Sequence, residues 1–278
     1  MRLVTCTKNL STLGAVAAFL IASAGLPSLS IANPLGSAGT LMAYAQGEEV
    51  DVELLLAVDI SQSMDTDEQE VQRAGYIAAL TSHEVLDAIQ QGLLGKIAVT
   101  YMEWGGTEEQ FTIADWSIIH DKASAERFAA QIAEAPLHQV QRTSISSALD
   151  KSVQLMSTNS YEGLRKVIDI SGDGPNNQGD SVTATRDRVL QTGITINGLP
   201  LMMKDQNSAW QTMLHLDHYY EDCVIGGPGA FAIPVRSKGG FAEAIRMKLV
   251  LEIAGLTVDQ PRVMRAAGRE KINCSLFE

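Results

Sequence analysis

Carboxylate and hydroxyl side chains follow apolar runs at three places in this sequence. Asp59, Ser61 and Ser63 occupy alternate positions directly after the run VELLLAV. Thr143 precedes a helical pattern, and Asp173 follows a second apolar run, VIDISG, and precedes a Gly-Pro turn. Oxygen ligands without His or Cys favour a hard divalent cation such as Mg²⁺ or Mn²⁺. The three places therefore predict one metal site, if the fold brings them together.

The first of these places has a simpler interpretation as well. Asp and Ser are common where a strand turns into a helix, because their oxygens accept hydrogen bonds from the free amides of the helix start. An Asp-x-Ser-x-Ser spacing also arises by chance. The metal site is favoured because all three places follow one another in the order that a single sheet edge would need.

The elements that must position these oxygens alternate between strands and helices. Strands are predicted from short apolar or β-branched runs, at residues 52–58, 96–104, 111–119, 165–171, 194–201 and 230–235. Helices are predicted from apolar residues at helical spacing, at residues 67–90, 124–135, 144–156, 181–193 and 240–255. This alternation predicts an α/β fold, a doubly wound and mostly parallel sheet with helices on both faces. In such sheets ligands bind beyond the carboxyl ends of strands, where Asp59 and Asp173 stand.

The three oxygen-bearing places resemble the metal-ion-dependent adhesion site of the von Willebrand factor A-domain superfamily. That site has Asp-x-Ser-x-Ser, then a distant Thr, then a distant Asp that is usually followed by Gly. The residues that match these elements, in order, are Asp59, Ser61, Ser63, Thr143 and Asp173.

The resemblance implies a von Willebrand factor A-like, Rossmann-type domain and a role for each residue. Ser61, Ser63 and Thr143 would bind the ion through their hydroxyls, while Asp59 and Asp173 would act mostly through bound waters. Mg²⁺ is the ion implied, with Mn²⁺ or Ca²⁺ as alternatives. One coordination position would remain for an Asp or Glu of a partner protein.

Two further features bear on this resemblance. The stretches DGPNNQG, GITINGLP and YYEDCVIGGPGAF resemble an uncharacterised family of exported bacterial A-domain-like proteins. Arg142 is a departure, because A-domains commonly have Gly before the Thr.

These features predict an exported, metal-dependent protein-binding module and not an enzyme. The sequence has no Gly-x-Ser-x-Gly elbow, no Walker motif and no dinucleotide-binding fingerprint. A metal-dependent hydrolase acting at the same residues is one alternative. A structural component whose ion only joins loops is another.

The first 45 residues have the pattern of a secretory signal peptide with a short leader. Arg2 and Lys8 precede an apolar stretch, no acidic residue occurs in this segment, and cleavage after Ala32 or Ala45 fits. A retained membrane anchor is the alternative interpretation. The remainder, 46–278, is predicted to be a single domain, periplasmic or secreted from a Gram-negative-like bacterium, without membrane insertion.

Charge and cysteine content agree with export. The formal net charge is −12, and removal of Arg2 and Lys8 with the leader makes it −14. Such a surface is a poor partner for nucleic acid, which requires clustered Lys and Arg. Cys223 and Cys274 are the two cysteines outside the leader, and an even pair in an exported chain predicts a disulfide, with two free thiols as the alternative.

The stretch HLDHYYEDC also contains side chains that bind metals. His215 and His218 are three positions apart and lack a convincing set of partners for zinc. We therefore interpret this stretch as the end of a surface helix.

Overall fold

The computed structural model describes residues 47–203, 215–255 and 269–276, all of which lie in one unit of the chain, Tyr44–Glu278. The predicted leader and its cleavage sites lie outside the described residues. None of the described helices is long and apolar enough to cross a membrane.

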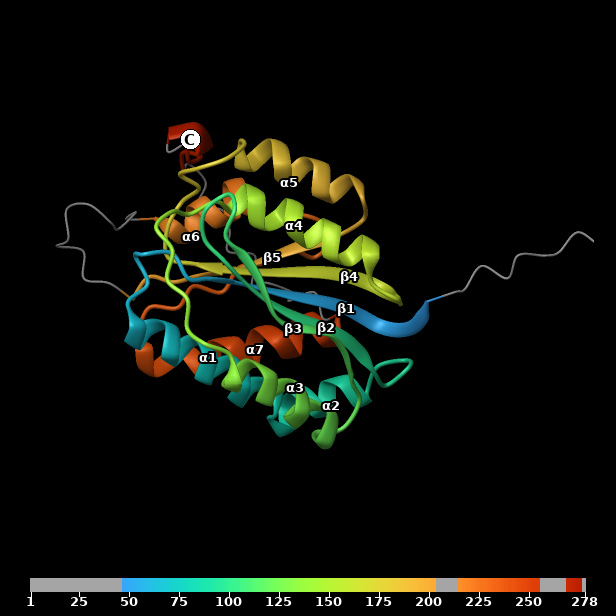
Figure 1. Ribbon diagram of the computed structural model, residues 1–278. Helices are drawn as coiled ribbons and strands as arrows, with labels where there is room; N and C mark the ends of the chain where they lie inside the picture. Colours follow the sequence, from blue (N-terminus) through green and yellow to red (C-terminus); the bar gives the residue numbers. More distant parts are fainter. Residues whose placement is uncertain (1–46, 204–214, 256–268, 277–278) are drawn as a thin grey trace, which may run out of the picture. The chain divides into compact units, whose positions relative to one another are not determined.

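A five-stranded sheet forms the centre of the fold (Figure 1). Its strands lie in the order β3-β2-β1-β4-β5. Their bounds are β1 Glu48–Asp59, β2 Ile97–Trp104, β3 Gln110–Ile119, β4 Tyr161–Gly172 and β5 Thr195–Pro200. All neighbouring strands are parallel except β2 and β3, whose short connection allows only an antiparallel hairpin. The prediction of a mostly parallel sheet is confirmed.

Helices cover both faces of this sheet, as the alternation of elements predicted (Figure 1). One face carries α1 (Thr66–Leu80), α2 (His83–Gln90), α3 (Lys122–Glu134) and α7 (Phe241–Ala254). The other carries α4 (Ile145–Thr158), α5 (Val182–Gln191) and the short α6 (Leu216–Tyr219), which continues into the π-helical turn η1 (Tyr220–Val224). Two 3₁₀ turns complete the elements, η2 (Lys238–Gly240) and η3 (Cys274–Leu276).

The second half of the central strand β1, residues 54–58, is apolar at every position. Leu54 and Leu56 pack in the core beneath α1 and α7, while Leu55 and Ala57 pack in the core beneath α4. Successive side chains of a strand point to opposite faces, so a strand covered on both sides loses the usual alternation of polar and apolar residues.

The predicted helix over residues 67–90 is two helices in the structure. The break between α1 and α2 lies at Ser82, whose hydroxyl accepts a hydrogen bond from the Val85 amide at 3.3 Å and caps the second helix. Apolar residues continue at helical spacing across the break, which is why periodicity alone predicted one element.

The predicted strand over 230–235 is not a strand in the described structure. Isolated bridges join Ala232 and Val235 to β5 and the residue after it. Pro234 lies between them and has no amide hydrogen to donate, so a continuous ladder cannot form.

The end of the described chain is held to η1. Cys223 and Cys274 form the predicted disulfide. Arg269 donates hydrogen bonds to both carboxylate oxygens of Asp222, at 2.8 and 2.9 Å, and the Ile272 amide donates to the same carboxylate at 3.0 Å.

Candidate functional site: an oxygen-lined edge of the sheet

The carboxyl ends of β1 and β4 lie side by side (Figure 1). Parallel pairing places Val58 opposite Ser171. Asp59 ends β1, and Asp173 follows the last residue of β4. Both carboxylates therefore leave the sheet at the same edge, as their positions after apolar runs predicted.

A chain of hydrogen bonds connects the first three predicted residues with the last. The Ser61 amide donates to Asp59 Oδ1 at 2.7 Å, which fixes the turn after β1. The hydroxyl oxygens of Ser61 and Ser63 are 3.0 Å apart, and the Ser63 hydroxyl donates to Asp173 Oδ1 at 2.5 Å. Two segments more than 100 residues apart thus share one polar cluster.

Thr143 reaches the same edge on the segment between α3 and α4. Val140 of that segment forms a parallel bridge with Ser61. The Thr143 amide donates to Asn177 Oδ1 at 3.1 Å, and the Asn177 amide donates to the Thr143 carbonyl at 2.9 Å. The Thr143 hydroxyl lies 4.0 Å from the point where a Cβ on Gly174 would stand. The structure therefore gathers all five predicted residues at one edge.

Burial at this edge makes the charge of Asp59 costly. Asp59 is fully buried, Asp173 is 8% exposed, and Asp59 Oδ2 has no hydrogen-bond partner among the described residues. Burial first, and then repulsion from Asp173, raise the pKa of Asp59 to about 7, against the hydrogen bond from Ser61. A divalent cation would allow both carboxylates to be ionised together. The unpaired oxygen and the all-oxygen set of side chains fit a hard cation such as Mg²⁺.

The five residues differ in how far they are from solvent. Ser61 and Thr143 are buried, as are the two carboxylates, and Ser63 is half-buried. The edge is thus accessible mainly on the side of Ser63.

Sequence reasoning missed Asn176 and Asn177, which hold the surrounding loops together. The side chain of Asn176 accepts from the Ser146 backbone amide through Oδ1 and donates to the Asp180 carbonyl through Nδ2, both at 3.1 Å. Its backbone amide donates to the Tyr219 hydroxyl, also at 3.1 Å. The sequence NNQG indicates only a turn. Two partners of Asn176, Ser146 on α4 and Tyr219 on α6, lie 30 or more residues away, so no local signal identifies them.

Gly172 also belongs to the site, because its lack of a side chain leaves room for Asp59 and Tyr220. A Cβ at this position would lie 2.8 Å from both Asp59 Oδ2 and the Tyr220 hydroxyl oxygen. Only glycine allows β4 to end so close to the buried carboxylate. The sequence shows a glycine there but not what it approaches.

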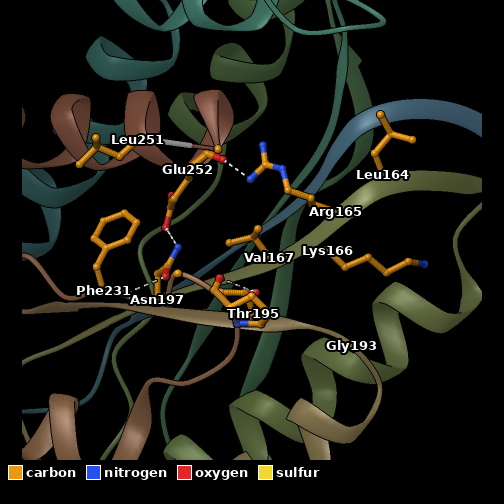
Figure 2. Close-up of a pocket in the computed structure, with 13 residues that line it drawn as sticks. Leu164, Arg165, Lys166, Val167, Gly193, Thr195, Asn197, Phe231, Leu251 and Glu252 are labelled. Carbon is orange, nitrogen blue, oxygen red and sulfur yellow. Dashed lines mark hydrogen bonds between the residues drawn. The ribbon is translucent and has the colours of Figure 1, made fainter. Parts of the chain in front are cut away.

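A cavity of about 340 Å³ lies elsewhere, between the first halves of β4 and β5 and the end of α7 (Figure 2). Figure 2 shows Asn197 between Glu252 and Phe231: its Nδ2 donates to Glu252 Oε1 at 2.9 Å, and its Oδ1 accepts from the Phe231 amide at 3.1 Å. Arg165 donates to the backbone carbonyls of Glu252 and Ile253 and thereby caps α7. None of the five predicted residues lines this cavity.

The order of the strands and the helices on both faces give this chain a von Willebrand factor type A-like fold. The fold is similar to the domain of the type V pili tip protein Mfa5 from Porphyromonas gingivalis, at 11% identity and a TM-score of 0.51 over 80% of this chain and 98% of that one. It is also similar to a von Willebrand factor type A protein from Catenulispora acidiphila, at 14% identity and a TM-score of 0.51 over 74% of this chain.

A third similar structure is proximal thread matrix protein 1 from the mussel byssus with a zinc-occupied metal-ion-dependent adhesion site, at 11% identity and a TM-score of 0.50 over 75% of this chain. The matches cover 43% of the Catenulispora protein and 46% of the mussel protein, so this chain spans about half of their length or less. At such identities the likeness concerns the fold alone.

Residues 49–257 match the family described as a protein of unknown function, DUF1194, and the chain belongs to this family. No curated protein has a matching sequence.

Proposed function

We propose that this protein is an exported binding module that uses a divalent cation, in the first place Mg²⁺, to capture an acidic side chain of a partner protein. The cation would be held at the edge formed by Asp59, Ser61, Ser63, Thr143 and Asp173. The observation that carries the proposal is the hydrogen-bond chain from Asp59 to Asp173, which begins at a carboxylate whose other oxygen is buried and has no partner among the described residues.

The side chains divide the task between them. Asp59 holds the turn by accepting from the Ser61 amide, and Asp173 orients the Ser63 hydroxyl. Ser61, Ser63 and Thr143 would offer neutral oxygens to the ion. With few anionic groups in direct contact, a bound ion keeps a strong attraction for an outside carboxylate.

Arg142 supports an acidic partner in particular. It is exposed directly before Thr143. The chain as a whole is strongly acidic and would repel an acidic partner at long range. A cation beside the binding edge reduces this repulsion where the contact would form.

Calorimetric titration of the purified exported protein tests the metal. We expect Mg²⁺ and Mn²⁺ to bind at one site, and Thr143→Ala and Ser61→Ala to weaken binding by about tenfold or more with little loss of fold. Ser157→Ala, which removes an exposed hydroxyl of α4, is the matched control. Wild-type metal binding in both site variants would dismiss the ligand assignment.

Capture from the native cell envelope tests the partner. Binding to the immobilised protein should need Mg²⁺, end with EDTA and be lost in Thr143→Ala. Converting carboxylates of the envelope proteins to amides should abolish capture, whereas acetylating their lysines should not. Capture that survives the loss of carboxylates would refute an acidic ligand. Metal-dependent turnover of phosphoester or peptide substrates, lost in Asp59→Ala, would replace the binding module with a hydrolase.

The proposal also places the mature chain, with residues 46–278 as a single domain, in the periplasm or outside the cell. Fractionation should recover it free of membranes, with an amino terminus at residue 33 or 46. Full-length protein that stays with the membrane after a high-salt wash would favour the retained anchor instead.

A further inference from the structure

A second group of metal-binding side chains lies at the start of α6, outside the oxygen-lined edge. His215, Asp217 and His218 each bring one ring nitrogen or carboxylate oxygen to within 4.8 Å of the others. His215 is exposed, and the other two are half-buried. We propose that these three side chains bind one transition-metal ion of the Zn²⁺ type, for which imidazole and carboxylate are the usual ligands.

Arg236 holds the carboxylate of this group in place. Its Nη2 donates to Asp217 Oδ2 at 2.7 Å, and Asp217 Oδ1 accepts from the His218 amide at 2.9 Å. A carboxylate oxygen has more than one lone pair, so each oxygen keeps one for a metal. Hydrogen bonds of this kind orient ligating carboxylates in known metal sites. Arg236 is distant in the sequence, and the histidine spacing alone therefore gave no sign of it.

The two imidazoles must turn before they can share an ion. Their rings are stacked, with centroids 4.9 Å apart and planes 13° apart. The nitrogen lone pairs lie in the ring planes, and nearly parallel planes do not meet at one nearby point. Rotation about Cβ–Cγ corrects this at low cost, because that torsion is broad in histidine.

The distances allow such a rearrangement. Zn–N bonds of about 2.0–2.1 Å place tetrahedral ligands about 3.4 Å apart. The ligand atoms must therefore approach one another by about 1.4 Å at most, starting from the observed 4.8 Å. His215 is exposed, so its ring can make this movement without disturbing the core.

Neighbouring side chains of the same stretch are committed elsewhere. Cys223 is in the disulfide, and Glu221 lies 3.4 Å from Arg269. Counting only the described residues, the site would thus have three protein ligands and an open fourth position, the number found in zinc sites that accept an outside ligand.

Zinc titration in the presence of excess Mg²⁺ tests this site, with Ser61→Ala as background so that zinc does not enter the oxygen-lined edge. We expect one equivalent to bind, and His215→Ala or His218→Ala to weaken it by about tenfold or more. Arg236→Ala should also weaken binding by about tenfold, although it removes no ligand. His83→Ala is the matched control, because His83 lies 3.0 Å from Asp87 and lacks a second histidine.

Cobalt gives an independent readout. Co²⁺ bound by two imidazoles in a site of low coordination number absorbs far more strongly in the visible range than Co²⁺ in an octahedral oxygen site. That absorption should appear in wild type and in Ser61→Ala and disappear in His218→Ala. Absence of zinc binding in the Ser61→Ala background, or equal affinity in the histidine variants and in His83→Ala, would overturn the proposal. Loss in Ser61→Ala alone would assign the zinc to the oxygen-lined edge and likewise refute it.

Discussion

Replacing Lys248 with Met should destabilise the protein strongly and in a pH-dependent way. Lys248 is fully buried in α7, where its Nζ lies 2.6 Å from Asp169 Oδ1 and also donates to Glu252. Both carboxylates are buried as well. Methionine keeps most of the side-chain volume and removes the only ammonium that touches both carboxylates in the described structure.

The magnitude follows from the burial of this group. At 2.6 Å the Coulomb attraction between unit charges is about 6 kcal/mol at an effective dielectric constant of 20, and desolvation offsets part of it. Removing one partner of a buried pair costs about 3–5 kcal/mol in measured cases. We expect a loss of that size in the free energy of unfolding at pH 8, where each carboxylate must either stay ionised without a counter-charge or take up a proton.

The sign of the pH effect comes from Glu252. Burial, and then repulsion from Asp169, raise its pKa from 4.5 to about 7, although Lys248 acts in the opposite direction. The folded chain therefore binds this proton more tightly than the unfolded chain, and the contribution of Glu252 to stability falls as pH rises from about 4.5 to about 7. Without the ammonium the pKa values of Glu252 and Asp169 rise further. The difference in unfolding free energy between wild type and Lys248→Met should therefore shrink by about 2–4 kcal/mol from pH 8 to pH 5.

Urea unfolding of wild type and variant at pH 8 and pH 5 measures these differences. Lys122→Met is the matched control, because Lys122 pairs with Glu126 on the surface and its loss should change stability by less than about 1 kcal/mol. The double variant Lys248→Met with Glu252→Gln should recover part of the loss at pH 8. A loss below about 1 kcal/mol at pH 8, or an equal loss at both pH values, would refute the reasoning.

Three further predictions concern the edge and the tail. Cys274→Ser should cost up to about 4 kcal/mol of stability, measured against wild type by urea unfolding, because its bond to Cys223 closes a long loop; an unchanged midpoint would contradict this. Gly172→Ala should lower the melting temperature, since its Cβ would meet the buried carboxylate at 2.8 Å, whereas Gly239→Ala, with open space around it, should not. Asn177→Ala should weaken Mg²⁺ binding by about tenfold in calorimetry, with hydrogen-exchange protection reduced around the predicted threonine ligand; full metal affinity would show that this pairing does not position the site.

Much of the fold could be predicted from local patterns. The apolar run at 52–58 became β1 because a strand covered on both faces must be apolar on both. Asp59, Ser61 and Ser63 are neighbours on one turn, so their convergence depends on local geometry. The positions of Thr143 and Asp173 after other elements then followed from the parallel order of the strands.

The sequence by itself therefore determined which residues each helix or strand buries and which oxygen-bearing side chains follow each strand. It could do so because periodicity and turn residues act within one segment. Only the tertiary structure decided that Asn177 pairs with Thr143, that Gly172 lies against Asp59, and that Arg236 orients a carboxylate between two histidines. These outcomes depend on contacts between segments that are distant in the sequence. The pattern of residues within one segment does not specify which other segment will pack against it.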